Sequence, residues 1–283
     1  MREGQKMRII NSVAATSVAL FLAAAPAEAA TTKIPAMQST IQYSKTSTAA
    51  SGFGNYTRAT SQVVYDSATD TYTVRDTGSL TTTSTFAPAN ITSTTANYTT
   101  YTKTSGSTTE TLRLLNSGAP LISLTYVDYG RWRRATTASG TTSVNDTYVV
   151  FGTKSPTSAV NSGSATYSTI VDGTFVNKTG SYAVSGTGTF TANFGASGGT
   201  LTYSTTASAT PETSGTAFSF GTMTGTGSIA TASSSFKGTG AVNGSGYAMD
   251  VAGNFYGPAA DEIGGLFHIK GNGGNGTGVI AGN

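Results

Sequence analysis

Residues 253–267 decide the fold, and they read Gly-Asn-Phe-Tyr-Gly-Pro-Ala-Ala-Asp-Glu-Ile-Gly-Gly-Leu-Phe. Gly257-Pro258 ends a first predicted strand, because proline fixes φ and has no amide hydrogen for a sheet. Gly264-Gly265 lets the chain bend into a second strand. Apolar residues share one parity on each side of this turn: Tyr247, Met249, Val251 and Phe255 before it, and Ile263, Phe267 and Ile269 after it. This period of two predicts a β-hairpin with one buried face.

The same stretch resembles the last hairpin of the β-barrel domain of transferrin-binding protein B. The shared pattern is Gly-x-Phe-Tyr-Gly-Pro-x-Ala-x-Glu-Ile-Gly-Gly-x-Phe. That superfamily includes bacterial surface lipoproteins, the secreted haem-binding hemophilins and transferrin-binding protein-like solute-binding proteins. The resemblance implies a handle domain followed by a barrel. It predicts the fold better than the ligand, because one fold can carry many functions.

The composition favours an all-β protein. Among 283 residues only 10% are charged, 35 are glycine, and Thr and Ser dominate the polar positions. Thr, Tyr and Val favour strands, whereas Gly favours turns. A hydrophobic fraction of 37%, with 14 Tyr and 12 Phe, argues against a disordered chain. The net charge of +3 is too weak and too scattered to indicate nucleic-acid binding.

The first 29 residues predict a secretory signal peptide. Lys6 and Arg8 precede an apolar run over residues 13–25, and Ala27-Glu28-Ala29 fits a cleavage site. Met7 is an alternative start to Met1. No later segment is apolar enough to cross a membrane as a helix. The chain has no cysteine, so it lacks disulfides, thiolate ligands and the residue that lipoproteins acylate.

The missing lipidation cysteine separates this chain from transferrin-binding protein B and makes it similar to the unanchored hemophilins. We therefore expect a secreted protein or one at the outer surface of the outer membrane, with the periplasm as an open alternative. After signal removal we expect no transmembrane span, and we expect a monomer.

Two domains are expected after the signal peptide, a β-rich handle over residues 30–155 and a barrel over residues 156–283. From Ser164 onward, roughly eight strand-like runs alternate with glycine-bearing turns, which predicts a C-terminal antiparallel β-barrel of about eight strands. Its interior should be filled by aromatic and branched side chains, which makes it a scaffold and not a pore. Gly186 and Gly188 share the apolar parity of their run and indicate a kink.

Two other β architectures are less well supported by the sequence. A repetitive solenoid needs a fixed period, and none is visible. An outer-membrane barrel needs an apolar outward band. Here the second face of most predicted strands carries Thr, Ser and Asn, which suits water.

The first candidate ligand-binding stretch combines Tyr129, Arg131, Trp132, Arg133 and Arg134. Aromatic and guanidinium groups together can stack on a flat ligand and pair with its carboxylates. Such residues are also enriched at protein interfaces. The alternative is a strand end with solvated arginines and a tryptophan that anchors the core.

His268 is the only histidine and is the second candidate, as an axial haem ligand. Its parity differs from that of Phe267 and Ile269, so we place it on the outside of the barrel. There it is either a solvated surface residue or a ligand in a cleft between the domains. None of the 14 tyrosines stands out as an iron ligand, and we interpret Tyr256 and Glu262 as structural residues of the turn.

The sequence supports a binding protein and not an enzyme. No nucleophile-elbow motif appears, and no residue set fulfils the requirements of an active site, so no catalytic residue is assigned. The resemblance implies capture of haem, iron or an iron-carrier protein, with delivery to a TonB-dependent outer-membrane receptor. The alternative is a surface adhesion or interaction protein without a small ligand, which the Thr/Ser/Asn-rich surface suggests.

Overall fold

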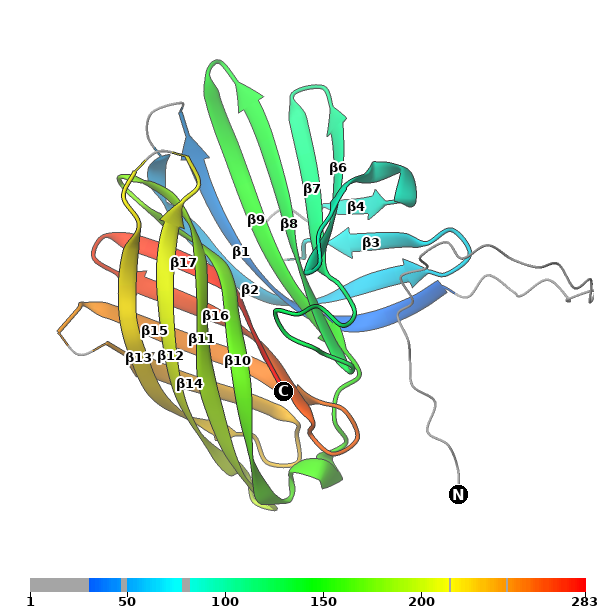
Figure 1. Cartoon of the computed structure of the whole chain (residues 1–283), viewed down its shortest axis with the longest axis vertical. Helices are drawn as coiled ribbons and strands as arrows, with labels where there is room; N and C mark the ends of the chain where they lie inside the picture. Colours follow the sequence, from blue (N-terminus) through cyan, green and yellow to red (C-terminus); the bar gives the residue numbers. More distant parts are fainter. Residues whose placement is uncertain (1–30, 47–49, 78–81, 214, 243) are drawn as a thin grey trace, which may run out of the picture.

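The computed structural model describes residues 31–46, 50–77, 82–213, 215–242 and 244–283, with only the backbone described over residues 50–56. These residues form a curled antiparallel sheet and a closed barrel that lie side by side (Figure 1). The expected all-β handle-and-barrel fold is therefore confirmed. The predicted signal peptide lies outside the described residues.

The handle is a nine-stranded sheet in the order β4-β3-β2-β1-β9-β8-β7-β6-β5. Its strands are β1 (Thr31–Lys45), β2 (Ala50–Asp66), β3 (Thr71–Arg75), β4 (Thr83–Phe86), β5 (Ile91–Thr94), β6 (Tyr98–Ser105), β7 (Thr108–Leu115), β8 (Val127–Ala138) and β9 (Thr141–Gly152). The first strand pairs with the last, β9, so the two ends of the handle meet in the middle of the sheet.

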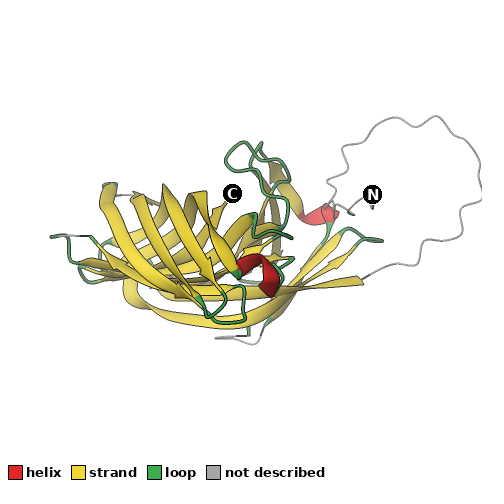
Figure 2. Cartoon of the chain, turned by 90° about the horizontal axis from the view of Figure 1, so that it is seen from below, coloured by secondary structure: helices red, strands yellow, loops and turns green. Residues whose placement is uncertain are grey.

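The handle sheet curls around its own apolar core (Figure 2). The edge strands β4 and β5 follow each other in sequence, joined by a 3-10 turn at Pro88–Asn90. Ser84 of β4 donates a hydrogen bond to Glu110 of β7 at 2.7 Å. Curling lets one face of the sheet bury a shared cluster: Ile34, Ala36, Val63, Tyr72, Val74, Phe86, Tyr101, Leu112, Leu114, Trp132, Val149 and Phe151.

The barrel is closed by pairing of its first and last strands, β10 and β17. Its eight antiparallel strands are β10 (Ser162–Asn177), β11 (Gly180–Gly195), β12 (Gly199–Pro211), β13 (Phe218–Ile229), β14 (Ser235–Ala241), β15 (Tyr247–Tyr256), β16 (Glu262–Gly271) and β17 (Gly274–Gly282). The predicted number of strands is confirmed. The proposed domain boundary at residues 155 and 156 falls in the connection between β9 and β10.

Aromatic side chains fill the barrel, as expected for a scaffold. Phe175, Phe218, Phe220 and Tyr247 pack together, and five of their six ring pairs are edge to face at 5.0–6.0 Å between centroids. The parity read from residues 253–267 is correct, because Met249, Val251, Phe255, Ile263, Phe267 and Ile269 all belong to this core. At Gly186, a Cβ atom would overlap the carbonyl oxygen of Thr206, so a side chain is excluded where β11 and β12 approach.

The outer face of the barrel carries exposed polar residues on several strands, as expected, but part of it is covered by the handle. The handle covers the outside of β10, β16 and β17, where a second apolar cluster forms between the two bodies. Leu266, Val279 and Ala281 of the barrel pack there with Val127, Tyr148 and Val150 of the handle. Strands β16 and β17 are thus buried on both faces, while the outer residues of β11–β13 stay exposed.

Candidate functional site

The five predicted site residues between 129 and 134 lie on β8. One face of this strand contacts the barrel, and the other faces the interior of the handle. Tyr129, Arg131 and Arg133 face the barrel. Trp132 faces the interior of the handle and is 3% exposed within the handle core. Arg134 lies on the same side as Trp132, because side chains alternate along a strand. Residues 129–134 are therefore divided between the contact with the barrel and the interior of the handle.

Arg131 and Arg133 belong to a buried charge network between handle and barrel. Both donate to Asp146 of β9, which is fully buried, with N–O distances of 2.6–3.0 Å. Both also donate to Glu212, at the end of barrel strand β12, at 2.6–2.8 Å. Two cations and two anions balance, so each guanidinium is compensated by carboxylates of the chain itself.

Hydroxyl groups complete this network, which we call the interdomain charge network. Tyr43 accepts a hydrogen bond from Arg133 at 2.9 Å, and burial raises the pKa of its phenol far above the usual value. Thr174 donates to Asp146 at 3.1 Å, and Ser181 donates to Glu212 at 3.0 Å. Since partners come from both bodies, the network fixes how the handle sits on the barrel.

A second ionic cluster joins the bodies through Tyr129. Its hydroxyl lies 2.8 Å from that of Tyr98, which in turn donates to Asp172 of the barrel at 3.2 Å. Arg113 of β7 donates to Asp172 at 2.8 Å and lies 4.5 Å from the ring centroid of Tyr98. Burial raises the pKa of Tyr129 well above its usual value, so it carries its proton as a hydrogen-bond donor.

Glu262 of the last hairpin binds a segment of the handle. It is 4% exposed, and its two carboxylate oxygens accept hydrogen bonds from three backbone amides, those of Thr125, Tyr126 and Val127, at 2.6, 2.8 and 2.9 Å. The sequence predicts a structural role for Glu262 within the turn itself. The structure instead directs the carboxylate to the β7–β8 segment, where it accepts hydrogen bonds from three backbone amides.

Asp128 should make the free energy of unfolding depend on pH. Burial raises its pKa from 3.8 to about 8, and the nearby Glu262 adds to the effect. Between these two values the folded state binds more protons than the unfolded state, so the free energy of unfolding falls as pH rises. Asp128→Asn should remove this slope, and the thermal midpoints of variant and wild type should diverge from about pH 4 to pH 8. Parallel curves across that range would contradict the assignment.

Trp132 and Arg134 border a small polar cavity inside the handle, together with Asp76, Thr82, Asn145 and Thr147. The Nε1 atom of Trp132 and the Nε atom of Arg134 are buried there without a hydrogen-bond partner. Arg134 also lies at the edge of an open hollow with Lys103 and Glu110. Its Nε atom is 3.6 Å from a carboxylate oxygen of Glu110, which forms an ion pair but no hydrogen bond.

His268 lies on the outer face of β16, as its parity predicted, between the fully buried Phe267 and Ile269. Its Nε2 atom is hydrogen-bonded to Asn275 on the neighbouring strand, and its Nδ1 atom lies 4.0 Å from Asp250. Burial lowers the pKa of the imidazole, so the neutral form is favoured. The ring is only 13% exposed at the barrel surface.

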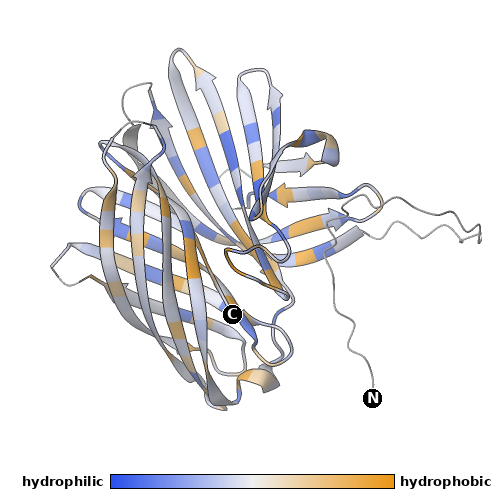
Figure 3. Cartoon of the chain, in the orientation of Figure 1, coloured by the Kyte–Doolittle hydropathy of each residue, from blue (hydrophilic) through white to orange (hydrophobic). Residues whose placement is uncertain are grey.

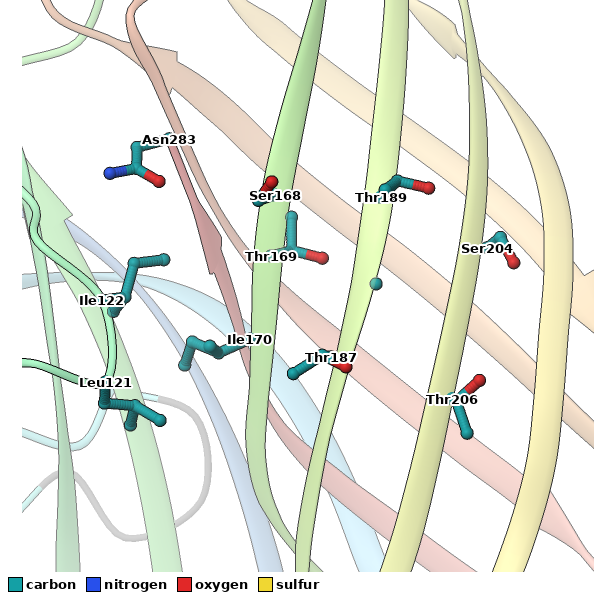
Figure 4. Close-up of a pocket in the computed structure, with 11 residues that line it drawn as sticks. Leu121, Ile122, Ser168, Thr169, Ile170, Thr187, Thr189, Ser204, Thr206 and Asn283 are labelled. Carbon is teal, nitrogen blue, oxygen red and sulfur yellow. The ribbon is translucent and has the colours of Figure 1, made fainter.

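An open hollow of about 580 Å³ lies between the β7–β8 segment and the outer wall of the barrel (Figure 4). Strands β10, β11 and β12 form one side, and Leu121 and Ile122 form the other. The sequence does not predict this site, because its residues come from five separate segments. A site of this volume is large enough for a small molecule.

The residues that the structure describes do not form a metal site. No group of three or more His, Cys, Asp or Glu side chains that could hold a metal ion occurs among them. In the same residues, no helix has the length and apolar character needed to span a membrane.

No protein-family model and no curated protein matches this chain. The chain is 18% identical to transferrin-binding protein B from serogroup B Neisseria meningitidis, over 86% of this chain and 42% of that one, with a TM-score of 0.44. It is 11% identical to a double mutant of the Haemophilus parasuis protein, over 90% and 76% of the two chains, with a TM-score of 0.45. For the N-lobe of lactoferrin-binding protein B from Moraxella bovis, the identity is 14%, the coverage 61% and 79%, and the TM-score 0.39.

The chain therefore spans less than half of the meningococcal protein that it matches. At these identities the likeness concerns the fold alone and names no ligand. This chain is similar to solved structures of transferrin- and lactoferrin-binding proteins B, and residues 253–267 resemble a hairpin of the former.

Proposed function

We propose that this protein is a non-enzymatic binding protein, secreted or held at the outer surface of the outer membrane, that captures an iron-carrier protein. It would pass iron or haem to a TonB-dependent receptor. One observation carries the proposal: a handle with exposed hairpins is fixed to a solid barrel by the interdomain charge network (Figure 1). The resemblance of the last hairpin supplies the class of partner.

The hairpins of the handle suit recognition of another protein. The β6–β7 hairpin turns at Gly106-Ser107 and the β8–β9 hairpin at Ser139-Gly140, and all four residues are exposed. Loops on a rigid scaffold are common binding elements, because the scaffold positions them without an ordering cost. We propose these two tips as contact sites.

Haem is an alternative ligand within the same proposal. The predicted site residues Tyr129, Arg131 and Arg133 contact the barrel, and Trp132 lies in the handle core. Arg134, with a side chain 34% exposed, is more accessible to a ligand than these arginines. His268 has the neutral imidazole that axial ligation requires. We propose His268 as the residue that would ligate haem, because Arg134 lies on the face of β8 that is turned away from the barrel and would not reach the same ligand.

The test measures binding of the purified protein to immobilised transferrin and lactoferrin, with a haemin titration alongside. We expect saturable binding to one carrier protein or a Soret shift with haemin. For a carrier protein, Ser107→Arg together with Ala138→Arg, an exposed residue next to the second tip, should weaken binding at least tenfold. Thr210→Arg, on the exposed outside of β12, is the matched control and should leave it unchanged. Absence of binding to both carriers and to haemin would overturn the proposal.

Adhesion is the second candidate, and the outer wall of the barrel favours it. Strands β11–β13 present exposed Thr and Ser residues, and Figure 3 colours these strands mostly pale, in the middle of the hydropathy scale. A strain that lacks the gene for this protein distinguishes adhesion from iron capture. Loss of surface attachment with normal growth under iron limitation would favour adhesion, whereas the opposite result would favour iron capture.

A further inference from the structure

We propose that the hollow between the β7–β8 segment and the barrel wall binds a neutral carbohydrate (Figure 4). This site is distinct from the hairpin tips proposed above for a carrier protein. Its lining combines outward Ser and Thr residues of β10, β11 and β12 with the apolar residues Leu121, Ile122 and Ile170.

The polar part of the lining consists of hydroxyl groups in regular rows. In register across the sheet, Ser168 faces Thr189, which faces Ser204, and Thr187 faces Thr206. The second row continues to Thr222 on β13, whose hydroxyl lies 2.8 Å from that of Thr206. A hydroxyl donates one hydrogen bond and accepts two, so these rows complement the hydroxyl groups of a sugar.

The apolar part of the lining lies opposite these rows. Leu121 is 43% exposed, which is unusual for a large apolar side chain in this protein, while Ile122 and Ile170 are buried beside it. A pyranose ring has an apolar C–H face and a polar rim. Leu121 can pack against the C–H face, while the threonine rows form hydrogen bonds with the polar rim.

The charge distribution excludes ionic ligands as the preferred class. None of the lining residues has a charged side chain. Between residues 179 and 236, the only charged residue in the sequence is Glu212, which belongs to the interdomain charge network. An anionic or cationic ligand would lose hydration in this hollow without meeting an opposite charge.

Saturation-transfer NMR and calorimetry with maltotriose, cellotriose and mannotriose test the proposal, with sialyllactose as a charged probe. We expect at least one neutral trisaccharide to bind. Thr187→Val/Thr206→Val keeps the shape and strand preference of both residues and removes two hydroxyls. It should weaken that binding about tenfold.

The matched control is Thr73→Val/Thr85→Val, an exposed threonine pair of the handle whose hydroxyls lie 2.8 Å apart, and it should leave the affinity unchanged. Unchanged thermal midpoints would show that both variants fold. Absence of binding to all three neutral sugars, or equal loss in both variants, would overturn the carbohydrate site. Carrier-protein binding by the hairpin tips is unaffected by either result.

Discussion

Asp146→Ala should lower the free energy of unfolding by about 4 kcal/mol, because it removes one of the two carboxylates that compensate Arg131 and Arg133. Asp146 is fully buried, so water cannot take its place without opening the interface. For a chain of this size, such a loss corresponds to a thermal midpoint about 10 °C lower. Denaturant unfolding and calorimetry measure both quantities.

Asp250→Ala is the matched control for this prediction. Asp250 pairs with Lys270 at 3.7 Å on the barrel surface, where the two side chains are 37% and 58% exposed. Solvent screens such a pair, so its loss should change the free energy of unfolding by less than about 1 kcal/mol. Equal effects of the two substitutions would show that the charge network does not hold handle and barrel together.

Glu262→Ala should lower the free energy of unfolding by about 3 kcal/mol. The substitution leaves the amides of Thr125, Tyr126 and Val127 without their acceptor, and hydrogen bonds to a charged group are among the stronger ones. Because these amides are local probes, hydrogen exchange at residues 125–127 should accelerate far more than exchange in the barrel core.

Two further variants serve as comparisons for Glu262→Ala. Glu262→Gln retains one carbonyl acceptor and should lose roughly half as much stability as the alanine variant. Glu110→Ala removes a carboxylate that binds Ser84 and Lys103 within the handle and should not alter exchange at residues 125–127. If amide exchange at these residues is the same in Glu262→Ala and wild type, the described hydrogen bonds do not restrain the segment.

The division of residues 129–134 between two surroundings could be predicted in part. Alternation along a strand places Trp132 and Arg134 on one face and the neighbouring odd-numbered residues on the other. The sequence also showed that several arginines cluster in a chain poor in charge. It did not show which acids oppose them, because Asp146 and Glu212 lie 13 and 79 residues from Arg133 along the chain.

The hollow beside the barrel could not be predicted from any sequence pattern. Its threonines look like ordinary outward residues of strands, and Leu121 looks like an exposed loop residue. Only strand register places Thr187 next to Thr206, and only the docking of handle on barrel places Leu121 opposite them.

By itself, the sequence determined the strand-forming segments, the inward parity of the last hairpin and the outward position of His268. These features are local, because a period of two follows from the geometry of a single strand. Only the tertiary structure decided that β1 pairs with β9, that the handle covers β16 and β17, and that Glu262 binds residues 125–127. These pairings depend on the shape and charge of surfaces that meet across more than a hundred residues, and no local pattern records which surfaces will meet.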